Sequence, residues 1–211
     1  MLMKKLLSNI NVAPIYDEIH MNLWENHISR HNPVTWKNTG GQILVEYEGH
    51  QRSSLKSNFP WEPFNKFNKY IGSLPEDMKD MFLPDFWPTE NYFYYPQTHK
   101  FLHWFTKTYG GKFARVIYYN TQPKNGVGTH ADGGRLSPDD DGWPMFADKD
   151  RFSLVVSGEY TLTVDEETEY LKTGDLWWFA NKLPHVHSSY NHGDTSKTNL
   201  IFDIEGSHWR E

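Results

Sequence analysis

The sequence predicts an α+β protein, with helices in its N-terminal half and an antiparallel β-sandwich or small barrel in its C-terminal half. Before residue 111, apolar residues recur every three to four positions, which is the period of an amphipathic helix. After residue 112, β-branched and aromatic residues form short runs separated by Gly, Asn, Asp and Pro. A chain of 211 residues can bury one sizeable core. We therefore expect a single domain, residues 1–211, in two layers.

The N-terminal part, residues 1–111, is predicted to be mainly helical. Pro14 suits the first turn of a helix, where its missing N–H removes no hydrogen bond. Gly110 and Gly111 suit the end of a helix, because glycine readily adopts the conformation that stops one. The predicted helices are residues 14–30, 61–74 and 99–109, and the predicted strand is residues 43–47.

The C-terminal part, residues 112–211, is predicted to be a β-structure of short strands. The dipeptide Gly158-Glu159 predicts a tight hairpin between two of them. The long connection of residues 133–150 has no periodicity and is expected to be either a binding loop or a solvated insertion. The predicted strands are residues 113–121, 151–157, 160–165, 176–180, 185–190 and 198–204.

Composition excludes several classes of function. The formal net charge is −6 and the basic residues are dispersed, so nucleic acid is not an expected partner. The sequence has no apolar run of about 18 residues and no signal-peptide pattern. We therefore expect a soluble, cytoplasmic protein without a membrane partner. The chain has no cysteine, so any metal must be bound by nitrogen and oxygen, and eleven histidines leave that option open.

A His-x-Asp pair ends one strand-like run. In an extended backbone, residues i and i+2 point to the same face, so His130 and Asp132 can reach one metal ion. The pair His192 and Asp194 has the same spacing, but Asn191 and Gly193 beside it predict a turn. We therefore prefer the first pair as a metal site.

The third ligand is expected from a later strand. His185 and His187 share a face, so only the register of that strand decides between them. Two imidazoles and one carboxylate form the facial triad of non-haem Fe(II) oxygenases, which leaves coordination positions open.

Four blocks of residues then follow in a recognisable order between roughly residues 113 and 205. They are His130-Ala131-Asp132, Arg151-Phe152-Ser153-Leu154, the run from Gly174-Asp175 through Phe179 to His185, and Lys197-Thr198-Asn199-Leu200-Ile201-Phe202-Asp203. In this order the blocks resemble the aspartyl/asparaginyl β-hydroxylase family of 2-oxoglutarate- and Fe(II)-dependent oxygenases. The resemblance implies a double-stranded β-helix, the jelly roll of the cupin kind, for the C-terminal part.

The resemblance also implies a set of site residues and cofactors. It assigns Fe(II) to three catalytic ligands, His130, Asp132 and His185, with His187 as the alternative to His185. Counting forward from Phe179 selects His185, whereas counting back from Asp203 selects His187. We prefer His185, because a hairpin loop varies in length more readily than the strand and turn that place the ligand.

Cofactor binding falls to three further residues in this resemblance. Arg151 would contact a carboxylate of 2-oxoglutarate, and Lys197 would contact the distal one, where the family usually has Arg. Ser153 stands where the family usually has a His in the co-substrate site, which removes one expected contact. The reaction would consume O2 together with 2-oxoglutarate.

The function expected from this resemblance is a 2-oxoglutarate- and Fe(II)-dependent dioxygenase that hydroxylates an amino acid or a peptidyl side chain. One alternative is a cupin-fold metal-dependent lyase or isomerase. Another is a non-catalytic jelly-roll domain that binds a sugar or peptide in an aromatic cleft formed by Trp143, Trp177 and Trp178. The sequence leaves the substrate and the oligomeric state undetermined.

Overall fold

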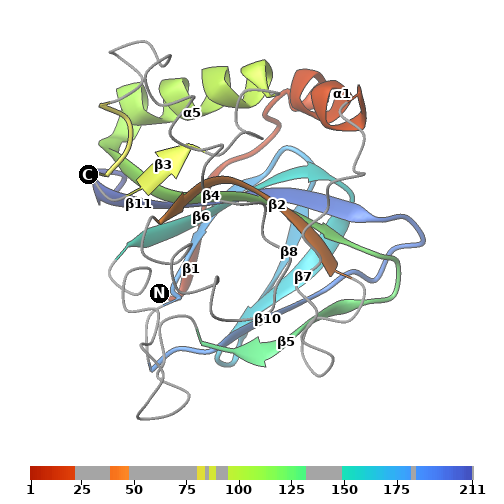
Figure 1. Ribbon diagram of the computed structural model, residues 1–211. Coiled ribbons are helices and arrows are strands. Elements are labelled where there is room, and N and C mark those ends of the chain that lie inside the picture. Colours follow the sequence, from red (N-terminus) through yellow and green to blue (C-terminus); the bar gives the residue numbers. More distant parts are fainter. Residues whose placement is uncertain are drawn as a thin grey trace, which may run out of the picture.

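Two antiparallel sheets and two helices make up the described part of the chain (Figure 1). The structure is a computed structural model, and it describes residues 1–21, 39–47, 80–83, 86–88, 95–131, 149–181 and 184–210. The elements are β1 (Met3–Leu7), α1 (Ala13–Met21), β2 (Thr39–Tyr47), β3 (Phe86–Pro88), α5 (Pro96–Tyr109), β4 (Gly110–Thr121), β5 (Gly126–His130), β6 (Asp150–Ser157), β7 (Glu159–Val164), β8 (Glu167–Lys172), β9 (Leu176–Phe179), β10 (His187–Tyr190) and β11 (Lys197–Ser207).

The eight strands from β4 to β11 form a jelly roll. The chain passes back and forth between a seven-stranded sheet, in the order β1-β9-β6-β11-β4-β2-β3, and a four-stranded sheet, in the order β5-β10-β7-β8. Most neighbouring strands are therefore distant in the sequence, as in two chain segments wound around each other into a double-stranded β-helix. This strand order confirms the expected fold class, an α+β protein with a jelly-roll core in its C-terminal half.

The N-terminal part adds both helices and strands to this core. Helices α1 and α5 lie over the face of the seven-stranded sheet that points away from the four-stranded sheet (Figure 1). Strand β1 pairs with β9 at one edge, while β2 and β3 extend the other edge beyond β4. Pairing covers edges of the jelly roll that would otherwise expose unpaired backbone groups. The strand predicted at residues 43–47 is part of β2, whereas the expectation of a mainly helical N-terminal part missed β1 and β3.

Most of the other predicted elements are present. The helix predicted at residues 99–109 is α5, which begins three residues earlier at Pro96. The predicted C-terminal strands correspond to β4, β6, β7, β9, β10 and β11, whereas β5 and β8 were not among the predicted strands. Helix α1 covers the start of the predicted helix 14–30, and the helix predicted at 61–74 lies outside the described residues.

The turn at Gly158 differs from its prediction. Gly158 joins β6 to β7, but these strands belong to different sheets, so the predicted hairpin is wrong. Its φ of +75° lies in the region that favours glycine, and an added Cβ would lie 2.9 Å from the Cβ of Lys197. The turn therefore brings the start of β7 beside the start of β11.

Aromatic side chains fill the layer between α5 and the seven-stranded sheet. Phe105 of α5 is fully buried, and its ring centroid lies 4.8 Å from that of Phe202 and 5.0 Å from that of Phe152. A second cluster lies on the other face of the sheet and includes Val155, Leu162 and Phe179. Strands β4 and β6 are buried nearly throughout because helices cover one face and the four-stranded sheet covers the other. The seven-stranded sheet thus gives the space between the two sheets a rigid wall.

A buried carboxylate connects the two helices. Glu18 of α1 is 8% exposed and accepts backbone hydrogen bonds from Gln97 at 2.6 Å and Thr98 at 2.7 Å. These are N–H groups in the first turn of α5, whose own N-cap residue, Tyr95, supplies no side-chain cap. The hydroxyl of Thr98 also donates to Glu18 and bonds to the hydroxyl of Tyr118. Glu18 therefore caps α5 from a neighbouring helix, which satisfies groups that would otherwise be buried without partners.

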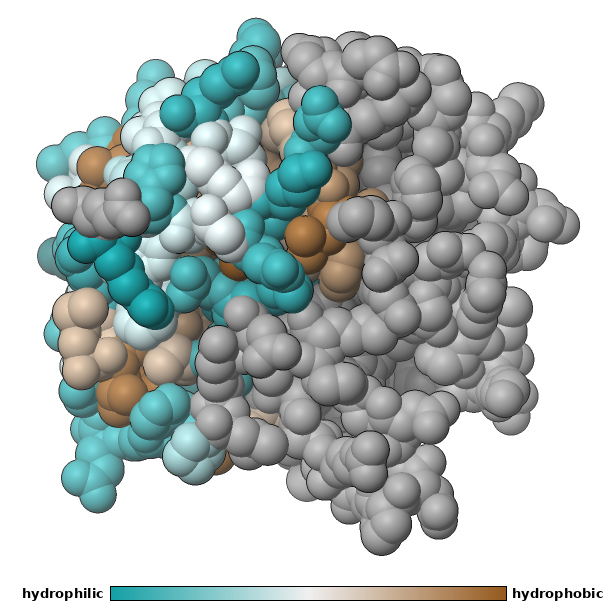
Figure 2. Space-filling model, turned by 90° about the vertical axis from the view of Figure 1, so that its left-hand side faces the viewer, coloured by the Kyte–Doolittle hydropathy of each residue, from teal (hydrophilic) through white to brown (hydrophobic). Residues whose placement is uncertain are grey.

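The surface seen in Figure 2 is mostly hydrophilic over the described residues, with apolar atoms in small patches. The exposed large hydrophobic residues in the described part are scattered over different elements: Met1, Tyr16, Trp104, Tyr170 and Tyr190. None of the helices described is long and apolar enough to cross a membrane.

Candidate active site

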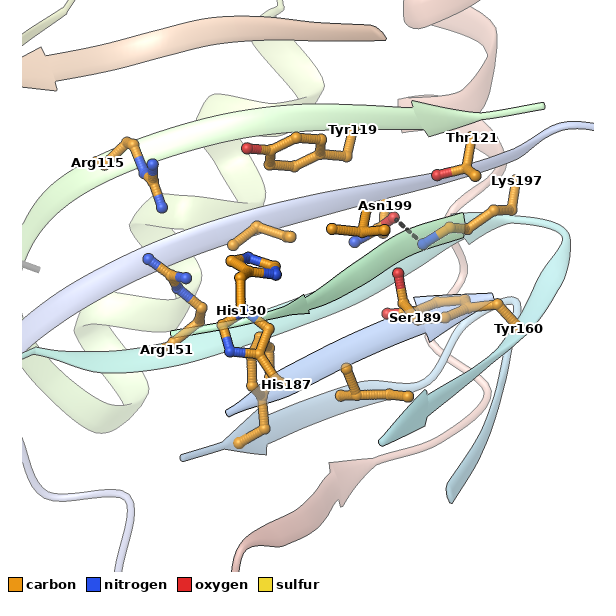
Figure 3. A pocket seen from close by; sticks show the side chains of 14 residues that line it. Arg115, Tyr119, Thr121, His130, Arg151, Tyr160, His187, Ser189, Lys197 and Asn199 are labelled. Carbon is orange, nitrogen blue, oxygen red and sulfur yellow. Dashed lines mark hydrogen bonds between the residues drawn. The ribbon is translucent and has the colours of Figure 1, made fainter. Parts of the chain in front are cut away.

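A pocket lies between the two sheets and is lined from both of them. Its polar lining comes mainly from β4, β5, β6, β10 and β11, and Figure 3 shows the side chains. The space between them amounts to about 610 Å³, including the part that opens to solvent. Of this, about 60 Å³ is open to the centre of a water-sized sphere, which is room for a few water molecules or a small ligand.

Two histidines face each other at one end of this pocket. His130 is the last residue of β5, His187 is the first residue of β10, and the two are direct partners in the antiparallel pairing. Their ring centroids lie 4.3 Å apart, so both imidazoles can reach one metal ion from adjacent strands. The structure therefore brings together the first predicted ligand and the alternative to the third.

His185 lies elsewhere. Its side chain is 33% exposed, and its Nδ1 lies 2.6 Å from a carboxylate oxygen of Asp165, in the turn that follows β7. The rule that residues two apart share a face holds only in an extended strand, and β10 begins at His187. His185 does not line the pocket, so the preference for it over His187 is not what the structure shows.

Both pocket imidazoles are held in the neutral form. Burial lowers the pKa of His130, and the positive charges of Arg151 and Arg115 lower it further, against the effect of a bond to the Gly128 carbonyl. Burial lowers the pKa of His187 strongly, with further lowering from His130 and the two arginines. Neutral imidazole is the form that binds metals.

The orientation of His130 also suits a metal ligand. Its Nδ1 lies 2.8 Å from the backbone oxygen of Gly128, and a carbonyl can only accept, so Nδ1 carries the proton. The lone pair is then on Nε2. A hydrogen bond from the second ring nitrogen is the usual support for a metal-bound imidazole.

The expected carboxylate ligand, Asp132, lies outside the described residues, as does the connection of residues 133–148. Within the described ranges, no cluster of three His, Cys, Asp or Glu could hold a metal ion. The donor set that the structure shows is therefore the pair of His130 and His187, and Asp132 follows His130 by two residues in the sequence.

Two buried arginines share one carboxylate beside the histidines. Arg151 of β6 donates from Nε and Nη2 to the two oxygens of Asp203, at 2.6 and 2.9 Å. The Nε of Arg115, from β4, lies 3.4 Å from the same carboxylate. Burial lowers the pKa of Arg151, and the charge of Asp203 opposes that shift. The fork of two parallel bonds keeps Arg151 charged and fixes its direction.

A lysine occupies another part of the pocket. Lys197, the first residue of β11, is 2% exposed, and Figure 3 shows it on the side away from the two arginines. Its Nζ lies 3.5 Å from the ring centroid of Tyr160 and 3.2 Å from Oδ1 of Asn199. Thr121 lines the pocket nearby, and its buried Oγ1 has no hydrogen-bond partner in the described part of the chain. The pocket thus has basic side chains at two separate places.

Ser153 supports the site from behind. It is fully buried and does not line the pocket, although the resemblance places it in the co-substrate site. Its Oγ accepts a bond from Nδ2 of Asn199 at 3.2 Å and lies 2.9 Å from the hydroxyl of Tyr160. Ser153 therefore holds two pocket residues in place.

Two residues that line the pocket, Arg115 and Tyr160, were not singled out in the sequence. Arg115 interrupts the apolar run of residues 113–118, and a charge at the centre of a buried strand is a signal that it has a partner or a ligand. Tyr160 carries no such signal, because a tyrosine is ordinary in a half-buried strand.

The other sequence motifs lie away from the pocket. His192 and Asp194 are in the connection between β10 and β11, where Oγ1 of Thr161 lies 2.9 Å from His192 Nε2 and Lys124 pairs with Asp194. Trp177 and Trp178 are buried at 5% and 8% exposure and form no aromatic cleft. Trp143 lies outside the described residues.

Comparison with known proteins gives fold-level similarities alone. No protein-family model matches the sequence, and no curated protein sequence matches it. Similar solved structures include a conserved protein of unknown function from Streptococcus pyogenes (15% identity, TM-score 0.32) and a predicted oxalate decarboxylase from Thermotoga maritima (17%, 0.34). A sugar phosphate isomerase from a cupin superfamily, from Silicibacter pomeroyi, is a third (18%, 0.32).

These matches cover 43%, 44% and 43% of this chain and 63%, 66% and 50% of the solved chains, which is less than two thirds of each. At such TM-scores the likeness carries no argument about this protein. The jelly-roll assignment rests on the strand order itself.

Proposed function

We propose that this protein is a 2-oxoglutarate- and Fe(II)-dependent dioxygenase that hydroxylates an amino acid or a peptidyl side chain. The observation that carries the proposal is the cross-strand pair of His130 and His187 in a pocket with buried basic side chains at two places. We assign His130, His187 and Asp132 as the iron ligands. Two imidazoles and a carboxylate suit Fe(II) and leave coordination positions for a co-substrate and oxygen.

The iron, when bound, would couple the oxidative decarboxylation of 2-oxoglutarate by O2 to hydroxylation of the substrate. The residues of the chain bind and orient the reactants. His130 and His187 offer neutral nitrogen donors, and Arg151, whose charge acts on both imidazoles, offers a guanidinium held by Asp203. Burial strengthens the attraction of these groups for an anion, because little water screens them.

The two cationic places suit a dicarboxylate. Arg151 lies on the side of the histidines, and Lys197 lies on the other side of the pocket (Figure 3). One carboxylate of 2-oxoglutarate would face Arg151 beside the metal, and the distal carboxylate would face Lys197. A buried cation is costly without a partner, so an anionic ligand is the natural complement of this pocket.

The metal-dependent lyase or isomerase shares the histidine pair but has no need of a second cation on the far side of the pocket. The non-catalytic alternative loses support because Trp177 and Trp178 belong to the core. Both alternatives differ from the oxygenase in what they do with 2-oxoglutarate, so one experiment separates the oxygenase from both.

The test is anaerobic reconstitution with Fe(II) and 2-oxoglutarate. We expect the weak visible charge-transfer band of the iron-bound co-substrate in the intact protein and its loss in His130→Ala and His187→Ala. His185→Ala is the matched control, because this imidazole lies near β10 but outside the pocket, and it should keep the band. Admission of O2 should then yield succinate even without a substrate.

Two results would overturn the proposal or part of it. A correctly folded intact protein that binds Fe(II) but shows neither the band nor succinate is not an oxygenase of this class. Loss of the band in His185→Ala, with retention in His187→Ala, would reverse the ligand assignment.

A further inference from the structure

We propose that Tyr160 and Asn199 are positioning residues for Lys197, which hold its amine at one side of the pocket so that it takes up a proton together with an incoming carboxylate. This inference rests on the proposed function only in naming 2-oxoglutarate as the ligand. The three side chains, together with Ser153, are called the lysine cage below.

Two side chains hold the amine of Lys197 from different sides. Nζ of Lys197 lies 3.5 Å from the ring centroid of Tyr160 and donates to Oδ1 of Asn199 at 3.2 Å. A lysine has a flexible stem and a single point of charge, so it does not define a direction as an arginine fork does. The ring face of Tyr160 and the amide oxygen of Asn199 fix the position of the amine, because they restrain it from two sides.

Ser153 holds the other members of the lysine cage in place. Nδ2 of Asn199 donates to Oγ of Ser153 at 3.2 Å, so the amide must present its oxygen to Lys197. The hydroxyl of Tyr160 lies 2.9 Å from the same Oγ. Ser153 therefore fixes both contacts of the lysine. The cage joins β6 and β11 of one sheet to β7 of the other, so its geometry is built into the fold.

The charge state of Lys197 depends on its surroundings. Lys197 forms no ion pair within the described residues, and burial alone lowers its pKa to about 7. The acidic groups around the pocket do not offer Lys197 a free anion. Tyr160 of β7 is neutral because burial raises its pKa, and the Asp203 carboxylate is bound by the arginines. The other charged or titratable residues that line the pocket are Arg115 on β4, Tyr119 on β4, His130 on β5, Arg151 on β6 and His187 on β10.

A proton-linked binding site follows from these contacts. A carboxylate beside Lys197 stabilises the charged amine and raises its pKa. Above pH 7, binding must then include the uptake of one proton, so the dissociation constant should rise toward about tenfold for each pH unit. An arginine at this position would stay charged and would show no such dependence.

The experiment is calorimetric titration of the full-length protein with 2-oxoglutarate and, separately, with succinate, from pH 6 to pH 9. Buffers of different ionisation enthalpy report the number of protons taken up. We expect the intact protein to take up close to one proton at pH 8.5. Succinate lacks the 2-oxo group, so it tests the lysine cage without chelation of iron.

Asn199→Asp is the decisive variant. Its carboxylate would pair with Lys197 inside the protein, so we expect affinity for both dicarboxylates to fall at least about tenfold and proton uptake to disappear. Asn120→Asp is the matched control, because Asn120 lies on the neighbouring strand β4, bonds to Thr198 and does not line the pocket. It should keep the affinity and the proton uptake of the intact protein.

A second pair of variants applies if Asn199→Asp does not fold. Tyr160→Leu removes the ring from Lys197 and should weaken succinate binding by about 3- to 30-fold. Tyr160→Phe retains the ring, so it should stay closer to the intact protein.

The outcomes separate the lysine cage from the proposed function. Unchanged affinity and proton uptake in Asn199→Asp, or unchanged affinity in Tyr160→Leu, would overturn the cage. A protein that binds succinate through Lys197 in the expected way, yet forms no iron complex with 2-oxoglutarate, would retain the cage and refute the oxygenase.

Discussion

Replacement of Lys197 by methionine should stabilise the ligand-free protein at low pH. The amine has a pKa of about 7 in the folded protein, against an ordinary value of 10.5 in the unfolded chain. The folded state therefore binds fewer protons than the unfolded state between these values, so this group costs stability as the pH falls from 10.5 to 7. The cost is fully present below pH 7 and absent above pH 10.5.

The size of the effect follows from the pKa difference. Each unit is worth about 1.4 kcal/mol, so the penalty of Lys197 is about 5 kcal/mol at pH 6 and about 2 kcal/mol at pH 9. Methionine is unbranched and fills a similar volume, but it loses the contact with the Tyr160 ring, worth about 1 kcal/mol. Lys197→Met should therefore raise the free energy of unfolding, by about 3 kcal/mol more at pH 6 than at pH 9.

The assay is urea denaturation of the metal-free protein at pH 6, 7, 8 and 9, followed by circular dichroism. Lys172→Met is a matched control, because Lys172 also lies over a tyrosine ring, that of Tyr170, but is exposed. The control should show little change at any of these pH values. A difference between Lys197→Met and the intact protein that does not vary with pH would refute the assignment of a buried amine whose pKa is lowered to about 7.

Two further substitutions test how the fold supports the site. Glu18→Ala leaves the first turn of α5 without its cap, so the free energy of unfolding should fall by about 1–3 kcal/mol. Asp17→Ala, exposed on the same helix, should cost far less, and equal costs would contradict the capping role. Asp203→Asn should destabilise the protein by about 3–5 kcal/mol, because two buried guanidinium groups lose their shared carboxylate. Glu205→Gln, half-exposed on the same strand, is its control, and similar losses in both would argue against a buried ion cluster.

The predicted helix at residues 99–109 and the C-terminal strands came from local patterns. Their periods arise because one face of a helix or strand packs against the core, and that constraint is visible in the order of the residues. Strand β8 escaped prediction because it has little apolar character: its residues are exposed except Leu171, so it lacks a regular buried face.

The hairpin predicted at Gly158 shows a limit of such patterns. A glycine between two strand-like runs indicates a turn, and the turn is present. Local residues do not determine whether the two strands pair with each other or enter opposite sheets, since that depends on strands elsewhere in the chain. Glu18 shows the same limit, because its partners in α5 are 79 and 80 residues away in the sequence.

The sequence by itself determined the fold class, His130 as part of the site, and both Arg151 and Lys197 as residues of the pocket. Only the tertiary structure places His187, and not His185, in the pocket beside His130. The spacing of two residues allows either one, and the choice depends on where β10 begins and which residue pairs with His130. Cross-strand pairing likewise added Arg115 and the lysine cage, because contacts between strands follow from register and not from distance along the chain.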